Sequence, residues 1–240
     1  MAPADGRGRG VVIDLQRNGD VFILKMDYGE NRFRPDKIDA WNAALDEVEK
    51  AGKPSALVTT GAGKFYSNGL DLDWMTGEAT AEAREAYIPG VLAVMARVLT
   101  FPCITVCAMN GHAFGAGAQI ALAHDYRVMR RDRGYFCMPE IDMGAPLHPG
   151  MTAIIQARLP HQTAHQVITE GRRYGGSDAL AAKIVDQVAD EAEVVPVARD
   201  LAAARASKAH PILRKLKSDM YPATLEALAV PMPDLPSGIG

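Results

Sequence analysis

The sequence predicts an α/β protein whose final quarter is all helix. Short apolar runs typical of strands alternate with longer amphipathic runs over about the first three-quarters of the 240 residues, and this alternation indicates an α/β fold. From about Glu191 onward the pattern is helical and rich in Ala, Lys and Arg, with prolines as breaks. We therefore predict a core over residues 1–190 and a C-terminal helical region over residues 191–240 that ends in a flexible tail.

The N-terminal part is predicted to begin with a β-hairpin. Residues 11–15 and 21–26 are strand-like, and Asn18-Gly19 between them favours a tight turn. The elements expected next are a helix from a cap at Asp36 to about Ala51, a strand over residues 56–60 and a helix over residues 80–100.

The stretch from Cys103 to Gly144 combines two features that suit acid–base chemistry. It contains an apolar strand, a Gly/Ala turn, a short apolar helix, a second strand and then Glu140. The turn at residues 115–117 stands where a strand passes into a helix, and the free N–H groups of a helix start favour developing negative charge. Apolar neighbours of Glu140 would raise the pKa of its carboxyl towards that of a useful base.

Three helices and an extended segment are expected after this stretch. The residues before them form a Pro/Gly-rich loop. The expected elements are helices over residues 151–159 and 161–170, a helix capped by Ser177 that runs to Ile184, and an extended segment over residues 185–188.

Composition and charge argue against several classes of function. A net charge of −3 gives no electrostatic footprint for nucleic acid, and no apolar run is long enough to span a membrane. The first residues do not form a secretory signal, and the three cysteines lie in apolar runs without the spacing of a zinc site. We therefore expect a cytoplasmic protein with core thiols, no metal, and no nucleic-acid or membrane partner.

The glycine-rich loop at residues 61–71 has the residue types of a nucleotide-binding loop but not their spacing. A P-loop requires glycine where Val58 stands and Ser or Thr where Phe65 stands. Ser67 also lacks the flanking glycines of a nucleophile elbow. The loop is therefore predicted to serve another purpose.

Three segments together resemble the crotonase superfamily, the enoyl-CoA hydratase/isomerase family. They are residues 65–71 (FYSNGLD), 110–117 (NGHAFGAG) and 138–144 (MPEIDMG), in the order and spacing of that family. The resemblance covers essentially residues 11–225. It implies a spiral of ββα turns stacked into two near-perpendicular sheets, and C-terminal helices that form homotrimers or hexamers.

The resemblance implies an acyl-CoA site built largely from backbone groups. The amides of Leu70 and Ala116 would form an oxyanion hole for the thioester carbonyl. No cofactor is implied, because CoA is part of the substrate. The residues expected at the substrate are Lys64, Ser67, Asn68, Gly69, Gly115, Gln119 and His148.

One position departs from the pattern of the family's hydratases, which carry two glutamates. Gln119 stands at the first of these positions and Glu140 at the second, and an amide can hydrogen-bond a water but cannot take its proton. A single carboxylate suits an isomerase that moves a 3-enoyl double bond to the 2-trans position, with Glu140 carrying the proton from C2 to C4. The amino-acid sequence of the chain most resembles the sequences of Δ3,Δ2-enoyl-CoA isomerases.

Two other functions stay open beside the isomerase. The first is a hydratase or another thioester lyase in which His148 or Asp142 replaces the missing carboxylate. The second is a catalytically silent acyl-CoA-binding subunit. Some residues also have a structural interpretation: Glu140 could be a strand-end carboxylate paired with an arginine, Asp71 a helix cap and His112 a structural histidine.

Overall fold

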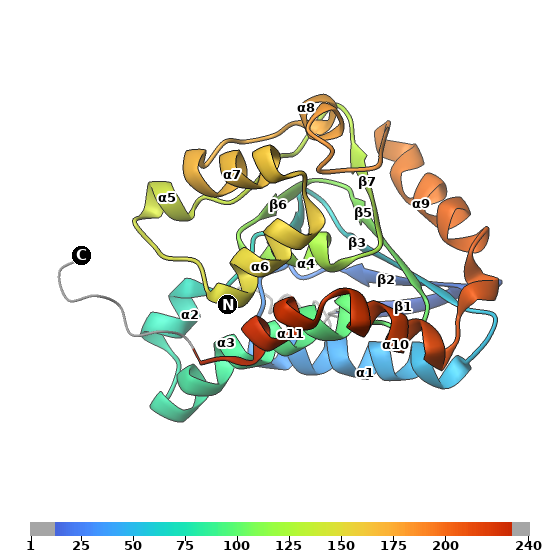
Figure 1. The fold of residues 1–240 in the computed structure, drawn as a ribbon, viewed down its shortest axis with the longest axis horizontal. Coiled ribbons are helices and arrows are strands. Elements are labelled where there is room, and N and C mark those ends of the chain that lie inside the picture. Colours follow the sequence, from blue (N-terminus) through green and yellow to red (C-terminus); the bar gives the residue numbers. More distant parts are fainter. Residues whose placement is uncertain (1–12, 232–240) are drawn as a thin grey trace, which may run out of the picture.

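Two sheets form the centre of the protein in the computed structural model, which describes residues 13–231 (Figure 1). The larger sheet has the strand order β1-β2-β3-β5-β7-β9, and the smaller one the order β4-β6-β8. Strands β1 and β2 are antiparallel, and all other neighbours are parallel. The bounds are β1 (Ile13–Asn18), β2 (Val21–Met26), β3 (Ala56–Gly61), β4 (Phe65–Ser67), β5 (Ile104–Met109), β6 (His112–Phe114), β7 (Tyr126–Arg130), β8 (Phe136–Cys137) and β9 (Gln187–Ala189).

Each strand of the smaller sheet directly follows a strand of the larger one, and helices come next. The pairs are β3–β4, β5–β6 and β7–β8. The predicted ββα turns are therefore confirmed. The smaller sheet places the ends of β4, β6 and β8 side by side, and the residues that follow these three strands meet at its edge.

The N-terminal hairpin is confirmed, with Gly19 in the left-handed region at φ 61°. Residues 11–12 of its first predicted strand lie outside the described residues. The next helix, α1 (Pro35–Ala51), begins two residues earlier than predicted, and Asp36 is not its cap. Arg34 occupies the cap position because Pro35, whose φ is already helical and whose missing N–H is not needed, starts the helix.

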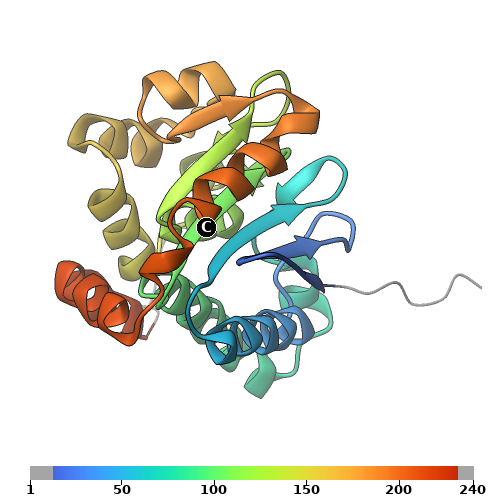
Figure 2. The same cartoon turned by 90° about the vertical axis from the view of Figure 1, so that its right-hand side faces the viewer.

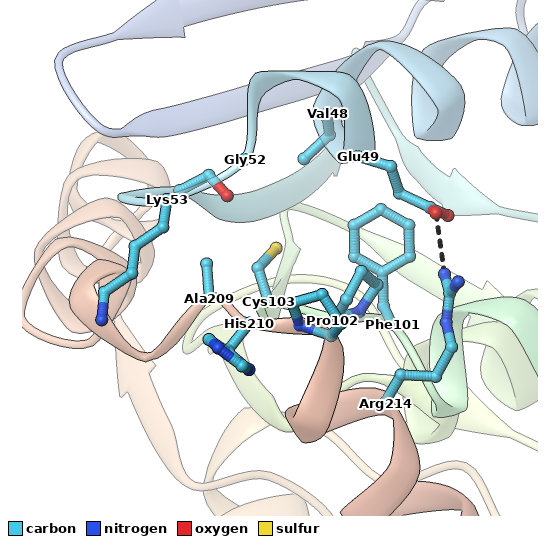
Figure 3. A pocket seen from close by; sticks show the side chains of 12 residues that line it. Val48, Glu49, Gly52, Lys53, Phe101, Pro102, Cys103, Ala209, His210 and Arg214 are labelled. Atoms are coloured by element: carbon cyan, nitrogen blue, oxygen red, sulfur yellow. Dashed lines mark ion pairs between the residues drawn. The ribbon is translucent and has the colours of Figure 1, made fainter.

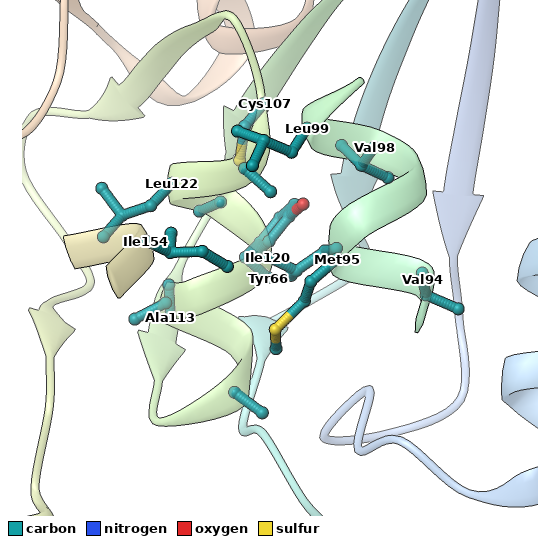
Figure 4. Packing of buried hydrophobic residues seen from close by; sticks show 14 of the residues in the cluster. Tyr66, Val94, Met95, Val98, Leu99, Cys107, Ala113, Ile120, Leu122 and Ile154 are labelled. Atoms are coloured by element: carbon teal, nitrogen blue, oxygen red, sulfur yellow. The ribbon is translucent and has the colours of Figure 1, made fainter. Parts of the chain in front are cut away.

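Helices α2 (Leu72–Gly77), α3 (Ala81–Leu99) and α4 (Ala116–Ala123) follow the first two ββ pairs. Asp71 caps α2, because its carboxylate accepts a hydrogen bond from the Trp74 amide (3.2 Å). The apolar face predicted for α3 packs against α1 and α4. Figure 4 shows this core around Tyr66, with side chains from α3, α4 and the strands in contact.

The third ββ pair leads into α5 (Glu140–Met143), α6 (Pro149–Arg158), α7 (His161–Glu170) and α8 (Gly176–Ala181). Ser177 was predicted to cap the last of these, and this prediction is wrong. Gly175 takes the cap position and α8 is short, since it ends at Ala181 rather than Ile184. The predicted extended segment lies slightly further along, as β9.

The C-terminal region is helical, as predicted. It contains two 3-10 turns (Glu191–Glu193 and Ala206–Lys208) and helices α9 (Val194–Ala203), α10 (Pro211–Met220) and α11 (Pro222–Ala229). Helix α9 packs on one face of the larger sheet (Figures 1 and 2), whereas α11 packs on α6 and α3. The division at residue 190 stays a prediction, and the predicted flexible tail lies, from residue 232, outside the described residues.

Helix α10 rests beside the C-terminal end of α1. A cavity of about 250 Å³ lies between them, and the Glu49–Arg214 ion pair (2.8 Å) belongs to its lining. Figure 3 shows the side chains that line it. Further along α10, the buried Lys217 ammonium donates hydrogen bonds to the Phe101 and Cys103 carbonyls and to the Asp125 carboxylate (2.9, 3.0 and 2.7 Å).

The three cysteines are buried free thiols, as predicted. None of the helices within residues 13–231 is long and apolar enough to cross a bilayer.

Candidate active site

A cavity of about 570 Å³ opens where the chain leaves β4, β6 and β8. This volume is typical of a small-molecule site. The lining comes from five parts of the chain: Arg32; Asn68, Leu70, Leu72, Asp73 and Met75; Ile88; Phe114, Gly115 and Ala116; and Pro139, Glu140, Met143, Ala145, Pro146, His148 and Met151. Six of the ten predicted site residues therefore line one cavity, namely Asn68, Leu70, Gly115, Ala116, Glu140 and His148.

Gly69 brings the first two loops into contact. Its φ of +83° is in the left-handed region, and a Cβ added to it would lie 2.8 Å from the Phe114 carbonyl oxygen and 3.0 Å from the Ala116 nitrogen. A side chain therefore has no room here. The close approach holds the backbone next to Leu70 against the start of α4.

Two backbone amides at this contact have no acceptor within residues 13–231. The Leu70 amide follows Gly69, and the Ala116 amide is the first of α4; neither donates a hydrogen bond to the described chain. An unpaired N–H is costly unless water or a ligand satisfies it. The positive end of the helix dipole makes the electrostatic potential at Ala116 more positive. The two amides can therefore donate hydrogen bonds to a partially negative oxygen.

Glu140 is the first residue of α5 and lines the same cavity as this amide pair, next to Gly115. A Cβ on Gly115 would lie 3.5 Å from its Oε1, while its Oε2 is buried without a hydrogen-bond partner. Burial raises the pKa of the Glu140 carboxyl above its usual value. The ion-paired interpretation finds no support, since no Lys or Arg within residues 13–231 forms a salt bridge with it.

Ser67 and Asn68 hold the loop that precedes Leu70. The Ser67 hydroxyl is fully buried; it donates to the Asn31 carbonyl (2.7 Å) and accepts from the Gly69 amide (3.2 Å). Asn68 lines the cavity and donates to Glu30 (2.9 Å). Lys64 lies outside the lining, exposed, with its ammonium 5.3 Å from the centre of the Phe65 ring.

Gln119 lies behind the cavity wall rather than in it. Its side chain is 0% exposed, and its Nε2 donates a hydrogen bond to the Met138 sulfur (3.5 Å), while its Oε1 has no hydrogen-bond partner within residues 13–231. Asp142 is exposed and also outside the lining, near Gly171 on the far side of α5.

His148 lines the cavity with both ring nitrogens engaged. Its Nδ1 accepts a hydrogen bond from the Gly150 amide (3.0 Å), which caps α6, and this leaves Nε2 as the donor to the Val230 carbonyl (3.0 Å). No lone pair or labile proton of the ring is therefore free to act on a ligand. His112, interpreted as a structural histidine, lies between aromatic rings with its Nδ1 unpartnered.

Sequence reasoning missed most of the apolar wall and the cation at the rim. Met75, Ile88, Met143 and Met151 line the cavity, and Arg32 pairs at its edge with Asp73 (2.8 Å). The apolar character of the four wall residues was the only signal in the sequence that could have marked them, and it fits core positions equally well. No group of three potential metal ligands occurs within residues 13–231.

Comparisons with known proteins place the chain in one family. The family model described as enoyl-CoA hydratase/isomerase matches residues 16–230. Two Arabidopsis thaliana proteins, enoyl-CoA delta isomerase 3 and enoyl-CoA delta isomerase 2, peroxisomal, are 37% and 36% identical to the chain. Each alignment covers 75% of this chain, and 79% and 78% of the two relatives.

A further relative and a solved structure extend the likeness. Carnitinyl-CoA dehydratase of Escherichia coli K12 is 31% identical over 221 residues, 89% of this chain and 81% of that protein. The apo structure of an enoyl-CoA isomerase of Mycobacterium tuberculosis superposes with a TM-score of 0.82 at 26% identity, over 90% of this chain and 94% of the other.

Proposed function

The chain belongs to the enoyl-CoA hydratase/isomerase family, and on this premise we propose that it is an enoyl-CoA isomerase that converts 3-enoyl-CoA into 2-trans-enoyl-CoA. The observation that supports this proposal best is that the partly buried Glu140 carboxyl, whose Oε2 has no partner in the described chain, lines the same cavity as two amides with no acceptor there. The Arabidopsis relatives are named isomerases.

In the proposed reaction, the thioester oxygen accepts hydrogen bonds from the Leu70 and Ala116 amides. Glu140 removes a proton from C2, and the electron pair of that C–H bond moves into a dienolate whose negative charge rests on the thioester oxygen. The protonated Glu140 then delivers the same proton to C4, and the double bond forms between C2 and C3. Each donor of such a hole contributes on the order of 3 kcal/mol in other enzymes.

Desolvation of Glu140 suits this role, because a carboxyl with a raised pKa is a stronger base when ionised. The apolar wall of Met75, Ile88, Met143 and Met151 fits an acyl chain. Asn68 and the loop before Gly69 are proposed to support the CoA, together with Lys64. Turnover is expected without an added cofactor.

The direct test follows conjugation of 3-hexenoyl-CoA by ultraviolet absorbance. Wild-type protein is expected to turn over, and Glu140→Gln to lose at least about a hundredfold in kcat, the scale of a lost general base. Asp142→Asn is the matched control, since this exposed carboxylate lies two residues away outside the cavity. Full activity in Glu140→Gln would refute the proposal.

A lyase is the second candidate, because one relative is named a dehydratase. Crotonyl-CoA hydration that survives Glu140→Gln but is lost in His148→Ala would favour it. The engaged ring nitrogens of His148 argue against that outcome. Tight CoA binding without turnover of any enoyl or 3-hydroxyacyl thioester would instead favour a silent subunit.

We also propose an oligomeric state and a cellular location for the protein. A homotrimer or hexamer is supported by the exposed apolar side chains of α10, Ile212, Leu216 and Met220. A cytoplasmic location is supported by the three free thiols, although two Arabidopsis thaliana relatives are named peroxisomal. Imaging of the tagged full chain would separate the two compartments.

A further inference from the structure

Tyr87 of α3 is a buried tyrosine whose hydroxyl connects two backbone segments beside the amide pair. It is 1% exposed. Its hydroxyl donates a hydrogen bond to the Phe33 carbonyl (2.5 Å) and accepts one from the Asp71 amide (2.8 Å). Leu70 immediately precedes Asp71, so this hydroxyl lies one peptide unit from a donor of the proposed oxyanion hole.

The same two segments form a single parallel β-bridge, between Phe33 and Leu70. The Phe33 amide donates to the Gly69 carbonyl (2.8 Å), on the N-terminal side of Leu70. In an ordinary parallel ladder the Asp71 amide would donate directly to the Phe33 carbonyl. Here the Tyr87 hydroxyl stands between these groups and completes the bridge on the C-terminal side of Leu70.

We propose that Tyr87 is a positioning residue that aims the Leu70 amide at the thioester oxygen, by fixing the Asp71 end of the loop while Phe33 fixes the Gly69 end. This inference rests on the proposed function. The peptide plane that carries the Leu70 N–H belongs to Gly69 and Leu70, and its rotation is limited only if both flanking peptides are held. Gly69, at φ +83°, has no side chain to limit it.

The surroundings of Tyr87 hold its ring in place and keep its hydroxyl uncharged. Its ring meets the Trp74 ring edge-on at 5.0 Å. Burial raises the pKa of the Tyr87 hydroxyl to about 12, so that it retains the proton that it donates. Trp74 is in turn held by the Asp71 cap of α2, which links the ring, the hydroxyl and the loop.

Tyr87→Phe tests the proposal, with Tyr66→Phe as the matched control. Tyr66 is also fully buried and bonded through its hydroxyl, to Thr59 (2.8 Å). Both variants lose one buried hydroxyl and should lose similar stability. Tyr87→Phe is expected to lower kcat on 3-hexenoyl-CoA by about tenfold, part of the cost of a whole donor, with KM changed less than about twofold. Tyr66→Phe should leave both constants near wild type.

A spectroscopic measurement distinguishes a misoriented Leu70 amide from a general loss of folded protein. Hexanoyl-CoA labelled with ¹³C at the thioester carbonyl cannot isomerise, and hydrogen bonds from the hole lower the carbonyl stretching frequency of the bound form. Tyr87→Phe is expected to lose much of this lowering, and Tyr66→Phe to retain it. A kcat and a carbonyl frequency equal to wild type in Tyr87→Phe would overturn the inference.

Two further outcomes are also decisive. If Tyr87→Phe is recovered unfolded, Trp74→Leu loosens the Tyr87 ring while keeping the hydroxyl; an unchanged carbonyl frequency there would refute the inference and a partial loss would support it. If wild-type protein does not isomerise 3-hexenoyl-CoA, the proposed function fails, whereas the carbonyl shift of bound hexanoyl-CoA in Tyr87→Phe still decides the inference.

Discussion

Glu140 is a partly buried carboxyl that forms no salt bridge within residues 13–231, and this determines how activity should depend on pH. Because burial raises its pKa above 4.5, the ionised base is formed only at higher pH. We expect kcat/KM for 3-hexenoyl-CoA to rise with pH through a midpoint above 4.5 and then level off. A profile whose acidic limb has its midpoint at or below that value would contradict the assignment of Glu140 as base.

The same burial makes a prediction for stability, with a defined sign. The folded state holds the Glu140 proton more tightly than the unfolded state does, so the free energy of unfolding is highest below the unfolded pKa and falls as pH rises through the folded pKa. Urea denaturation of wild type and Glu140→Gln should therefore show wild type losing stability relative to the variant between acid and neutral pH. A constant difference would contradict this.

A substitution of Gln119 tests whether this amide, which stands where the family's hydratases carry their first glutamate, takes part in the chemistry. Its Oε1 is buried without a partner, and an unpaired buried polar group costs about 1–3 kcal/mol. Gln119→Leu, with similar volume, should unfold at equal or higher urea concentration and keep its kcat. A loss of activity of tenfold or more in this variant would instead show that the amide acts on the substrate.

At the scale of single residues, the sequence predicted which backbone positions come together, while the roles of these residues stay predictions. Leu70, Ala116 and Glu140 follow strand ends in recognisable segments, and they share one cavity. The Tyr87 hydroxyl contacts a carbonyl 54 residues away in the chain, and no local pattern encodes such a distance. The fully buried Gln119 could not be placed either, because the helix that contains it is buried on every side.

Among the elements, α10 is attached to the core by a charge as well as by apolar contacts. Lys217 is buried, with two carbonyls and Asp125 as partners. Lys217→Met should cost about 3 kcal/mol of unfolding free energy, because it leaves a partly buried carboxylate and two carbonyls unpaired. Lys215→Met, which removes an exposed pair with Asp219, is the control and should change stability by less than about 1 kcal/mol. Equal urea midpoints for the two variants would contradict this view of α10.

Element boundaries show where local rules compete. Both missed caps, at Asp36 and Ser177, were chosen for side chains that suit the cap position. Pro35 and Gly176 begin the helices instead, and the cap positions fall to Arg34 and Gly175, whose backbone is extended. In α8, a Cβ on Gly176 would meet the Arg130 carbonyl oxygen at 2.6 Å, so packing against β7 sets the helix start rather than capping.

For the whole molecule, the unpartnered surface of α10 predicts assembly. Ile212, Leu216 and Met220 are 54%, 55% and 67% exposed and recur every four residues on one face. Replacing Leu216 by Lys should weaken the proposed trimer, and light scattering would then show smaller particles than for wild type at the same concentration. A wild-type protein that is already a stable monomer would contradict the prediction.

The alternation of strands and helices was sufficient to predict the fold class, and the three segments to predict the two-sheet spiral. The pattern could not predict which of the similar helices near the end of the chain buries its apolar face and which leaves it exposed. The apolar face of α9 is buried on the larger sheet, whereas that of α10 is exposed. Both read as amphipathic, because a sequence records that a face is apolar but not which surface covers it.

The close approach at Gly69 has a consequence for how freely this protein can change. In the proposed reaction the two donors are main-chain groups, so the side chains of Leu70 and its neighbours in the cavity would contact the acyl chain without taking part in the chemistry. Substitutions of these side chains are therefore expected to change the chain-length preference without removing either donor. Gly69 itself allows no such freedom, and even alanine there would force the two loops apart.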